Sequence, residues 1–172
     1  GGPPDAGGLA ACIVGREGIA QLSRERLRME MMKLLIAPHA LATLIVMTDT
    51  GLLLRILGGV TYLASFENVV KVEAAIGVAP DPVQRLGALG VMVAEDAHRL
   101  YERLRLTNSE VGRLTSMAEG WRRISPKIGE QGARALIYRL GARAFTDHAL
   151  LGWARSEAGA HDKAWLGLST LP

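Results

Sequence analysis

Four polar residues recur at helical spacing near the start of the chain and are the first candidates for a shared task. Ser23, Arg26, Glu30 and Lys33 lie within residues 18–35, and on a helix they form one polar row beside an apolar face. Arg26 and Glu30 stand four residues apart, where they can form an ion pair. Alone, the row indicates a surface ladder of pairs worth about 0.3–0.5 kcal/mol each. Because the same helix is apolar on two sides, the row can instead hold this helix against a partner domain.

No other spacing in the sequence suggests catalysis. The four histidines are scattered singly, and His161-Asp162 lacks the further ligands that a metal-dependent phosphohydrolase needs. There is no Walker A motif, no Gly-x-Gly-x-x-Gly after a strand and no Gly-x-Ser-x-Gly elbow. Glu95 and Asp96 are adjacent, so on a helix they point about 100° apart. We therefore expect no catalytic residue, no metal site and no cofactor in this chain.

A basic segment is the strongest electrostatic signal. Residues 99–143 hold ten Lys or Arg and four Asp or Glu, a surplus of six charges, whereas residues 61–98 hold two against five. A localised surplus is typical of proteins that bind polyanions, although a solvated arginine-rich surface gives the same pattern. The candidates for RNA binding are Arg103, Arg105, Arg113, Arg122, Arg123, Lys127, Arg134 and Arg139.

The composition predicts an all-α fold. Hydrophobic residues make up 49% of the chain and aromatic residues only 5%, so the core must consist of Leu, Ile, Val, Ala and Met, which favours helices over strands. The single cysteine, Cys12, excludes a Cys-based zinc site and is expected to be a small buried residue. The most apolar stretch, residues 40–47, is far shorter than the ~20 residues that span a bilayer. We expect a cytoplasmic protein with no membrane partner.

Caps and breakers divide the chain into about eight to ten short helices in antiparallel pairs. Ser23 is the expected N-cap of a helix that Pro38 ends, with an apolar stripe of Leu27, Met31, Leu34 and Leu35. Residues 39–50 are apolar nearly all round, so this helix is expected to be central. Further helices are expected over residues 63–76, after Asp81-Pro82, over 95–106, behind the capping box Thr107-Asn108-Ser109-Glu110, over 130–140 and 142–156, and from Asp162.

Several of these segments resemble the bacterial type of tRNA nucleotidyltransferase (CCA-adding enzyme) and poly(A) polymerase. Residues 22–35 are similar to the family pattern Ile-Ser-x-Glu-Arg-x-x-x-Glu-Leu-x-Lys-Leu-Leu, and residues 49–53 stand where the family has a Gly-Leu-Leu-like step. Gly58-Gly59 replaces the Pro-Glu that is usual after this step. Residues 81–89 and 104–110 also resemble the helical body of the family.

The resemblance implies a division into a neck, residues 1–60, a helical body, residues 61–124, and further body or tail helices, residues 125–172. It also implies a catalytic head, which carries the Mg²⁺ ligands and selects CTP or ATP and whose motifs do not occur in this chain. The row from Ser23 to Lys33 would then brace the neck against this head. The expected function is the RNA-binding and head-bracing portion of an enzyme that adds CCA, or A, to tRNA 3′ ends. The alternative is a free-standing helical protein-interaction module.

Overall fold

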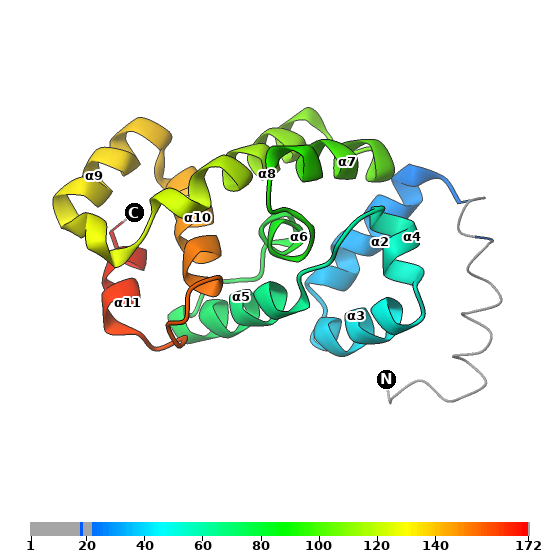
Figure 1. The fold of residues 1–172 in the computed structure, drawn as a ribbon, viewed down its shortest axis with the longest axis horizontal. Coiled ribbons are helices and arrows are strands. Elements are labelled where there is room, and N and C mark those ends of the chain that lie inside the picture. The colour runs from blue at the N-terminus through cyan, green and yellow to red at the C-terminus, as the bar shows by residue number, and fades with distance from the viewer. Residues whose placement is uncertain (1–17, 19–21, 172) are drawn as a thin grey trace.

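The computed structural model describes Gly18 and residues 22–171, and over these residues it contains ten α-helices, two short 3-10 helices and no strand (Figure 1). The all-α expectation is confirmed. Cys12 lies outside the described residues. The helices are α2 (Arg24–Leu35), α3 (Ala40–Asp49), α4 (Leu52–Leu57), α5 (Leu63–Ile76), α6 (Pro82–Gly90), α7 (Ala94–Leu104), α8 (Asn108–Gly120), η2 (Trp121–Arg123), η3 (Pro126–Ile128), α9 (Gly129–Leu140), α10 (Ala142–Ala154) and α11 (Lys163–Ser169).

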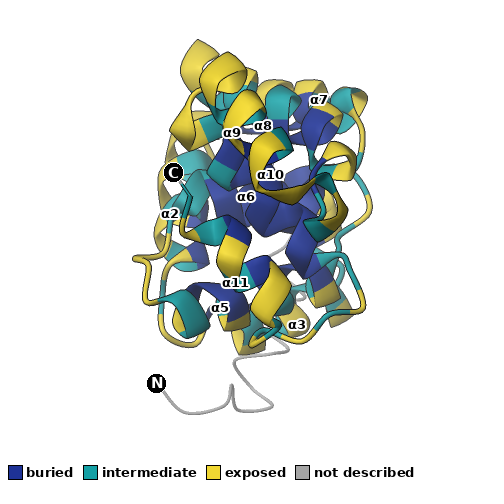
Figure 2. Cartoon of the chain, turned by 90° about the vertical axis from the view of Figure 1, so that its left-hand side faces the viewer, coloured by how far each residue is buried: buried dark blue, intermediate teal, exposed yellow. Residues whose placement is uncertain are grey.

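Helix α6 lies in the centre of the molecule. It contacts α2, α5, α7, α8 and α10, and Figure 1 shows it end-on among its neighbours. Residues 84–90 are all buried, which gives α6 its dark blue colour in Figure 2. Small residues let the neighbours approach closely: a Cβ atom on Gly87 would lie 2.6 Å from the Met117 sulfur of α8.

A buried ion pair connects α6 to two of its neighbours. The Arg85 guanidinium donates through Nε and Nη2 to Glu73 Oε2 of α5, at 2.9 and 2.7 Å. Its Nη1 donates to the carbonyl oxygen of Leu35 at the end of α2, at 2.8 Å. Because the last carbonyls of a helix have no partner inside the helix, Arg85 satisfies one of them while it neutralises Glu73.

The local signals in the sequence set the helix boundaries. Ser23 and Asp81 accept backbone hydrogen bonds as the N-caps of α2 and α6, as expected. Asp162, near which the last helix was expected to begin, is the N-cap of α11. The capping box at the start of α8 is confirmed, since Thr107 accepts from the Glu110 N–H and the Glu110 carboxylate accepts from the Thr107 N–H. Most expected helices lie within two residues of the observed bounds.

The expectation that residues 39–50 form a central helix was wrong. In α3, only Ala40 and Leu44 are buried, and Ile45 is 42% exposed. The helix packs through one face against α4 and α5. Leu41 and Met47 are only partly buried against the core, and Ile45 faces the solvent. The central helix is instead α6. Its position was not predicted, because the helix is short and contains the polar residues Gln84 and Arg85.

The buried apolar residues form two clusters that interleave along the chain. The larger one surrounds α6 and includes Leu151 of α10. The smaller one joins α9, α10 and α11 and includes Val72 of α5 and the stacked rings of Trp153 and Trp165. The domain boundaries expected at residues 60 and 124 stay a prediction. No helix in the described part of the chain combines the length and hydrophobicity that a membrane span requires.

Replacing Arg85 should destabilise the fold strongly. The side chains of Arg85 and Glu73 are 9% and 4% exposed, so Arg85→Gln leaves a buried carboxylate without its cation, at a cost of about 3–5 kcal/mol in the free energy of unfolding. Lys71→Gln is the control, because Lys71 pairs with Glu67 on the exposed side of α5, the helix that carries Glu73, and its replacement should cost about 1 kcal/mol or less. Urea denaturation measures both, and equal costs would contradict the role of Arg85.

Candidate nucleic-acid interface

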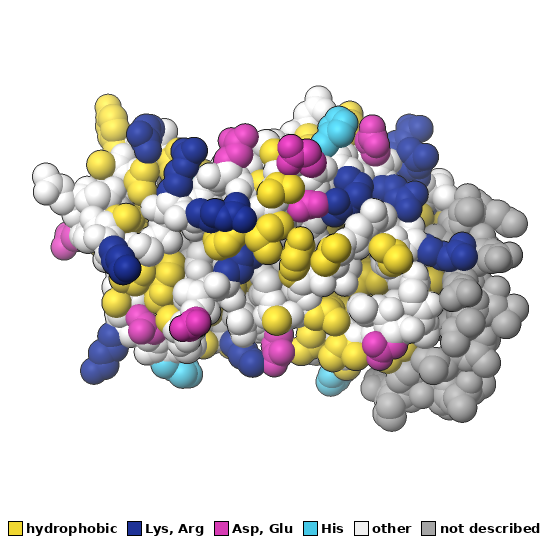
Figure 3. All heavy atoms as spheres, viewed as in Figure 1, with side chains coloured by type: hydrophobic (Ala, Val, Ile, Leu, Met, Phe, Trp, Pro, Cys, Tyr) yellow, Lys and Arg dark blue, Asp and Glu magenta, His cyan; other side chains and the backbone are white. Residues whose placement is uncertain are grey.

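Five arginines gather where α7 lies beside α2 and α4, and we call them the junction cluster: Arg24, Arg55, Arg99, Arg103 and Arg105. Hydrogen bonds between the helices hold them there. Arg103 Nη2 donates to the Arg55 carbonyl oxygen at 3.1 Å, and Arg24 Nη1 donates to the Glu102 carbonyl oxygen at 3.0 Å. Figure 3 shows Lys and Arg side chains gathered over this end of the molecule.

Two glycines make room for the cluster. A Cβ atom on Gly58 would lie 2.6 Å from Arg103 Nε, and one on Gly59 would lie 2.4 Å from Arg99 Cζ. Gly58 also has a φ of 73° as the C-cap of α4, a conformation that favours glycine. The Gly58-Gly59 pair therefore lets two arginines of α7 lie close against the chain that leaves α4.

Three guanidiniums of the cluster carry charge that no carboxylate of the described residues neutralises: Arg24, Arg55 and Arg103. Arg99 pairs with Asp96, and Arg105 pairs with Glu25 at 3.3 Å. An open hollow of about 680 Å³ lies over this region, lined by Arg24, Tyr101, Glu102, Arg103, Arg105 and Leu106. The Glu102 carboxylate offsets part of the positive charge, so the hollow is basic without being uniformly so.

Helix α2 is fixed in this position by a second arginine. Arg28 donates through Nε and Nη2 to the two carboxylate oxygens of Glu110, at 2.9 and 2.6 Å. Glu110 is also the last residue of the capping box of α8, so one carboxylate caps α8 and holds α2. The cap was predicted from the sequence. The ion pair with Arg28 was not, because this residue lies 82 positions away and no local pattern indicates the contact.

The structure divides the eight candidates for RNA binding among three places. Arg103 and Arg105 belong to the junction cluster. Arg113 lies between α6, α8 and α10. The others lie on η2, η3 and α9, at the opposite end of the molecule (Figure 1): Arg122, Arg123, Lys127, Arg134 and Arg139. The basic segment of the sequence therefore forms two separate basic surfaces, and RNA contact by each residue stays a prediction.

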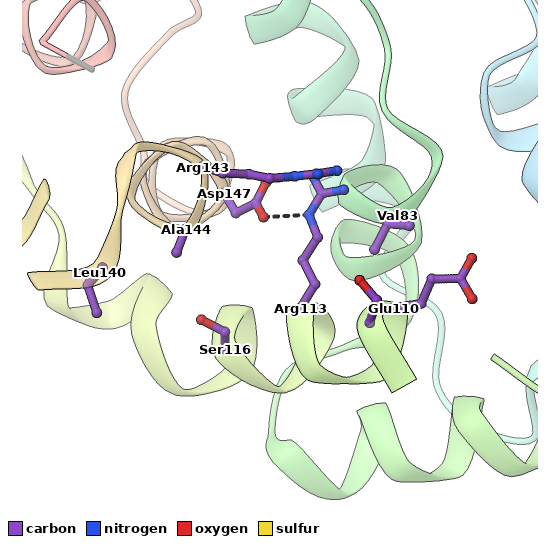
Figure 4. A pocket seen from close by; sticks show the side chains of 9 residues that line it. Val83, Glu110, Arg113, Ser116, Leu140, Arg143, Ala144 and Asp147 are labelled. Atoms are coloured by element: carbon purple, nitrogen blue, oxygen red, sulfur yellow. Dashed lines mark hydrogen bonds and ion pairs between the residues drawn. The ribbon is translucent and has the colours of Figure 1, made fainter. Parts of the chain in front are cut away.

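Arg113 is engaged inside the protein. It donates to both carboxylate oxygens of Asp147, at 2.6 and 2.7 Å, and to Asp81 at 2.8 Å. Figure 4 shows the pair with Asp147 in a pocket between α8 and α10. These two carboxylates raise the pKa of Arg113, although burial alone lowers it. Its main role in this arrangement is to join three helices.

The polar row of α2 lies at the surface. Ser23 accepts a hydrogen bond from the Arg26 N–H at 3.2 Å, so its side chain acts as the N-cap. Glu30 pairs with Lys33 at 3.2 Å rather than with Arg26, and all four residues are exposed. The bracing role of the row stays a prediction. Among the residues that the structure describes, no group of three or more His, Cys, Asp or Glu can hold a metal ion.

The carboxylates that pair with arginines should make the fold sensitive to acid. Burial raises the pKa of Asp81, but hydrogen bonds from Arg113 and from the Gln84 and Val83 N–H groups lower it below its usual range. Because the unfolded chain binds this proton more tightly, the stability it contributes is present above about pH 4 and is lost as the pH falls through the folded-state pKa.

The variant Asp81→Asn keeps the N-cap but removes the negative charge. As the pH is lowered from about 5 to 3, we therefore expect the free energy of unfolding of this variant to decrease less than that of the unchanged protein. Asp162→Asn is the control, since Asp162 caps α11 and has no ion pair within residues 22–171. The same loss in the unchanged protein and in both variants would contradict this account.

A match to a known protein family falls on the part of the molecule that carries the junction cluster. Residues 11–63 match the family described as the probable RNA and SrmB-binding site of polymerase A. The matched segment includes α2, α3 and α4, and with them Arg24 and Arg55 of the junction cluster. A search of curated protein sequences gives no match. Residues 11–63 are therefore similar to an RNA-binding segment of polymerase A, and this match covers about a third of the chain.

Proposed function

We propose that this chain is the RNA-binding part of a tRNA nucleotidyltransferase of the CCA-adding and poly(A) polymerase type, and that the junction cluster contacts RNA phosphates. One observation carries the proposal. Arg24 and Arg55, which lack carboxylate partners in the described chain, lie in the segment that matches an RNA-binding family, and α7 adds Arg103 beside them.

The chemistry of the cluster suits an RNA backbone. Guanidinium groups bind phosphate oxygens with charge-assisted hydrogen bonds, and the side chains of Arg24 and Arg103 are oriented by the carbonyl groups to which they donate. Tyr101, which is 36% exposed and lines the same hollow, offers a ring on which an unpaired base can stack. Such a surface recognises backbone and shape more than sequence, as a protein that acts on many tRNAs requires.

The outward face of α2 supports the second half of the expected function, the bracing of a catalytic head. Met29 of α2 is 51% exposed, and Leu22 and Ile36, which flank the two ends of this helix, are 43% and 41% exposed. Large apolar side chains that gather at a surface indicate a contact with another protein surface. We propose that the head covers this face in the intact enzyme.

Nucleotide transfer is not assigned to the described residues. The resemblance implies that Mg²⁺ and CTP or ATP bind to the head, and no cluster of metal ligands lies within residues 22–171. What these residues supply is positioning of the RNA. The choice among CCA, CC and A addition lies outside this proposal.

The second candidate function is that of a protein-interaction module. It is favoured by the same exposed face of α2 and by Ile45 of α3, which is 42% exposed. The two functions differ in their response to salt, because apolar contacts are little weakened by it whereas phosphate contacts are weakened steeply.

Loss of two arginines from the cluster should weaken RNA binding and its salt dependence. For the double variant Arg24→Gln, Arg103→Gln, we expect a lower affinity for a tRNA transcript without its 3′ CCA. We also expect the slope of log affinity against log salt to flatten by about one to two units, because two phosphate contacts are lost. Fluorescence anisotropy over a salt series measures both quantities.

The matched control is Lys71→Gln, Lys163→Gln, which removes two positive charges from exposed positions on α5 and α11. A general electrostatic attraction predicts equal effects in the two double variants, and that result would remove the cluster from the RNA surface. A larger loss in Arg122→Gln, Arg123→Gln than in the cluster variant would move the main RNA contact to η2.

The bracing proposal predicts a small effect of Glu30→Ala on the chain alone. The Glu30–Lys33 pair is exposed, with side chains 61% and 71% accessible, so we expect the free energy of unfolding to change by about 1 kcal/mol or less. In the enzyme that includes the head, the same change should lower transfer activity more than this small loss of stability explains. A large drop in the melting temperature of the chain alone would show that the row supports its own fold instead.

A further inference from the structure

A small pocket at the opposite end of the molecule contains an unusual set of polar side chains. It lies between α8, η2, α9 and α10 and has a volume of about 90 Å³. A single water needs about 10–15 Å³ of such space, so a small tetrahedral anion fits. It shares Ser116 and Leu140 with the pocket that Figure 4 shows. Its polar residues are Ser116, Glu119, Arg123, Arg139 and His148.

The buried end of this pocket is formed by His148. The residue is 3% exposed, and its Nε2 lies 2.9 Å from the hydroxyl oxygen of Ser116. A Cβ atom on Gly120 would lie 2.1 Å from the imidazole ring, so only glycine at this position leaves space for the ring. Burial lowers the pKa of His148 below its usual value, and the charge of Arg123 lowers it further, while Asp147 opposes this.

The open end of the pocket carries two free cations. Arg123 of η2 and Arg139 of α9 line it, and neither guanidinium has a hydrogen-bond or carboxylate partner in the described part of the chain. Glu119 is the one acidic residue in the lining. With a neutral imidazole, the lining has a net charge of +1, and protonation of His148 raises it to +2.

We propose that this pocket binds a single phosphate group. Guanidinium groups are donors that proteins direct at phosphate oxygens, and the imidazole adds a positive charge that depends on pH. The phosphate can belong to the RNA that the proposed function requires, in which case this inference rests on that function. A free phosphate or phosphorylated small molecule presents the same chemistry.

The pocket makes the binding dependent on pH. A bound dianion favours the imidazolium form of His148, so binding strengthens as the pH falls toward the pKa of this residue. The charged residues of the lining are Glu119 of α8, Arg123 of η2 and Arg139 of α9. Asp147 of α10 also acts on the ring, although it is paired with Arg113 of α8. Sulfate is the suitable probe, because it stays a dianion between pH 5 and pH 8 and isolates the titration of the protein.

NMR of the histidine rings tests the proposal directly. His39, His98 and His161 are exposed, so they serve as internal references for unspecific effects. On titration with inorganic phosphate, we expect saturable shifts of the His148 ring signals and a raised pKa for His148 alone. In a sulfate series, the dissociation constant should decrease as the pH is lowered from 8 to 5.

Matched variants locate the binding. Arg123→Gln and Arg139→Gln should each weaken phosphate binding about tenfold, because each removes a charge-assisted contact. Arg134→Gln is the control, since Arg134 lies on the same helix as Arg139 and pairs with Glu130 away from the pocket lining. Glu119→Gln should tighten binding, because it removes the only negative charge of the lining.

Binding of a tRNA transcript to the pocket variants distinguishes an RNA phosphate from a free phosphate as the ligand. If the ligand is an RNA phosphate, Arg139→Gln weakens tRNA binding more than Arg134→Gln, and free phosphate competes with the RNA. If it is a free phosphate, the pocket variants lose the phosphate shifts and bind tRNA normally. The proposal is overturned if phosphate produces no saturable change at His148, or if Arg134→Gln matches the pocket variants. Either outcome is independent of the test on the junction cluster.

Discussion

The guanidinium of Arg85 joins three helices in the interior of the protein, where its charge is satisfied by Glu73 of α5 and by the last turn of α2. A buried cation needs a nearby anion and hydrogen-bond acceptors, because an unpaired charge in this environment is very costly. This requirement fixes how far α2 and α5 can shift relative to α6. The positions of the surface residues on α2 follow from it.

The junction cluster is a consequence of that packing. With α2 held by Arg85 and by the Arg28–Glu110 pair, its first turn lies beside the end of α7, and Arg24 reaches the Glu102 carbonyl. The Gly58-Gly59 step lets the arginines of α7 lie against the exit from α4. Charges far apart in the sequence thus form one basic surface that overlaps the segment with the RNA-binding match.

Local features were predictable from the sequence, and distant partnerships were not. The caps at Ser23 and Asp81 were predictable because a cap depends on residues within one turn. The central place of α6 was not, since it depends on small residues that meet side chains of other helices. The surplus of charge over residues 99–143 was correctly counted, but α8 leads from α7 toward α9 at the opposite end of the molecule and so separates the start of that segment from its end (Figure 1). The polar row of α2, by contrast, was placed beside the apolar face of this helix from periodicity alone.

Crosslinking of the protein to a tRNA transcript, followed by mass spectrometry of the crosslinked peptides, tests the central claim most directly. The account predicts that crosslinked peptides come mainly from the first turn of α2, from α4 and from the end of α7 near Tyr101, and that excess unlabelled tRNA removes them. Crosslinks confined to α5, α10 or α11, with none at the junction of α2, α4 and α7, would contradict it.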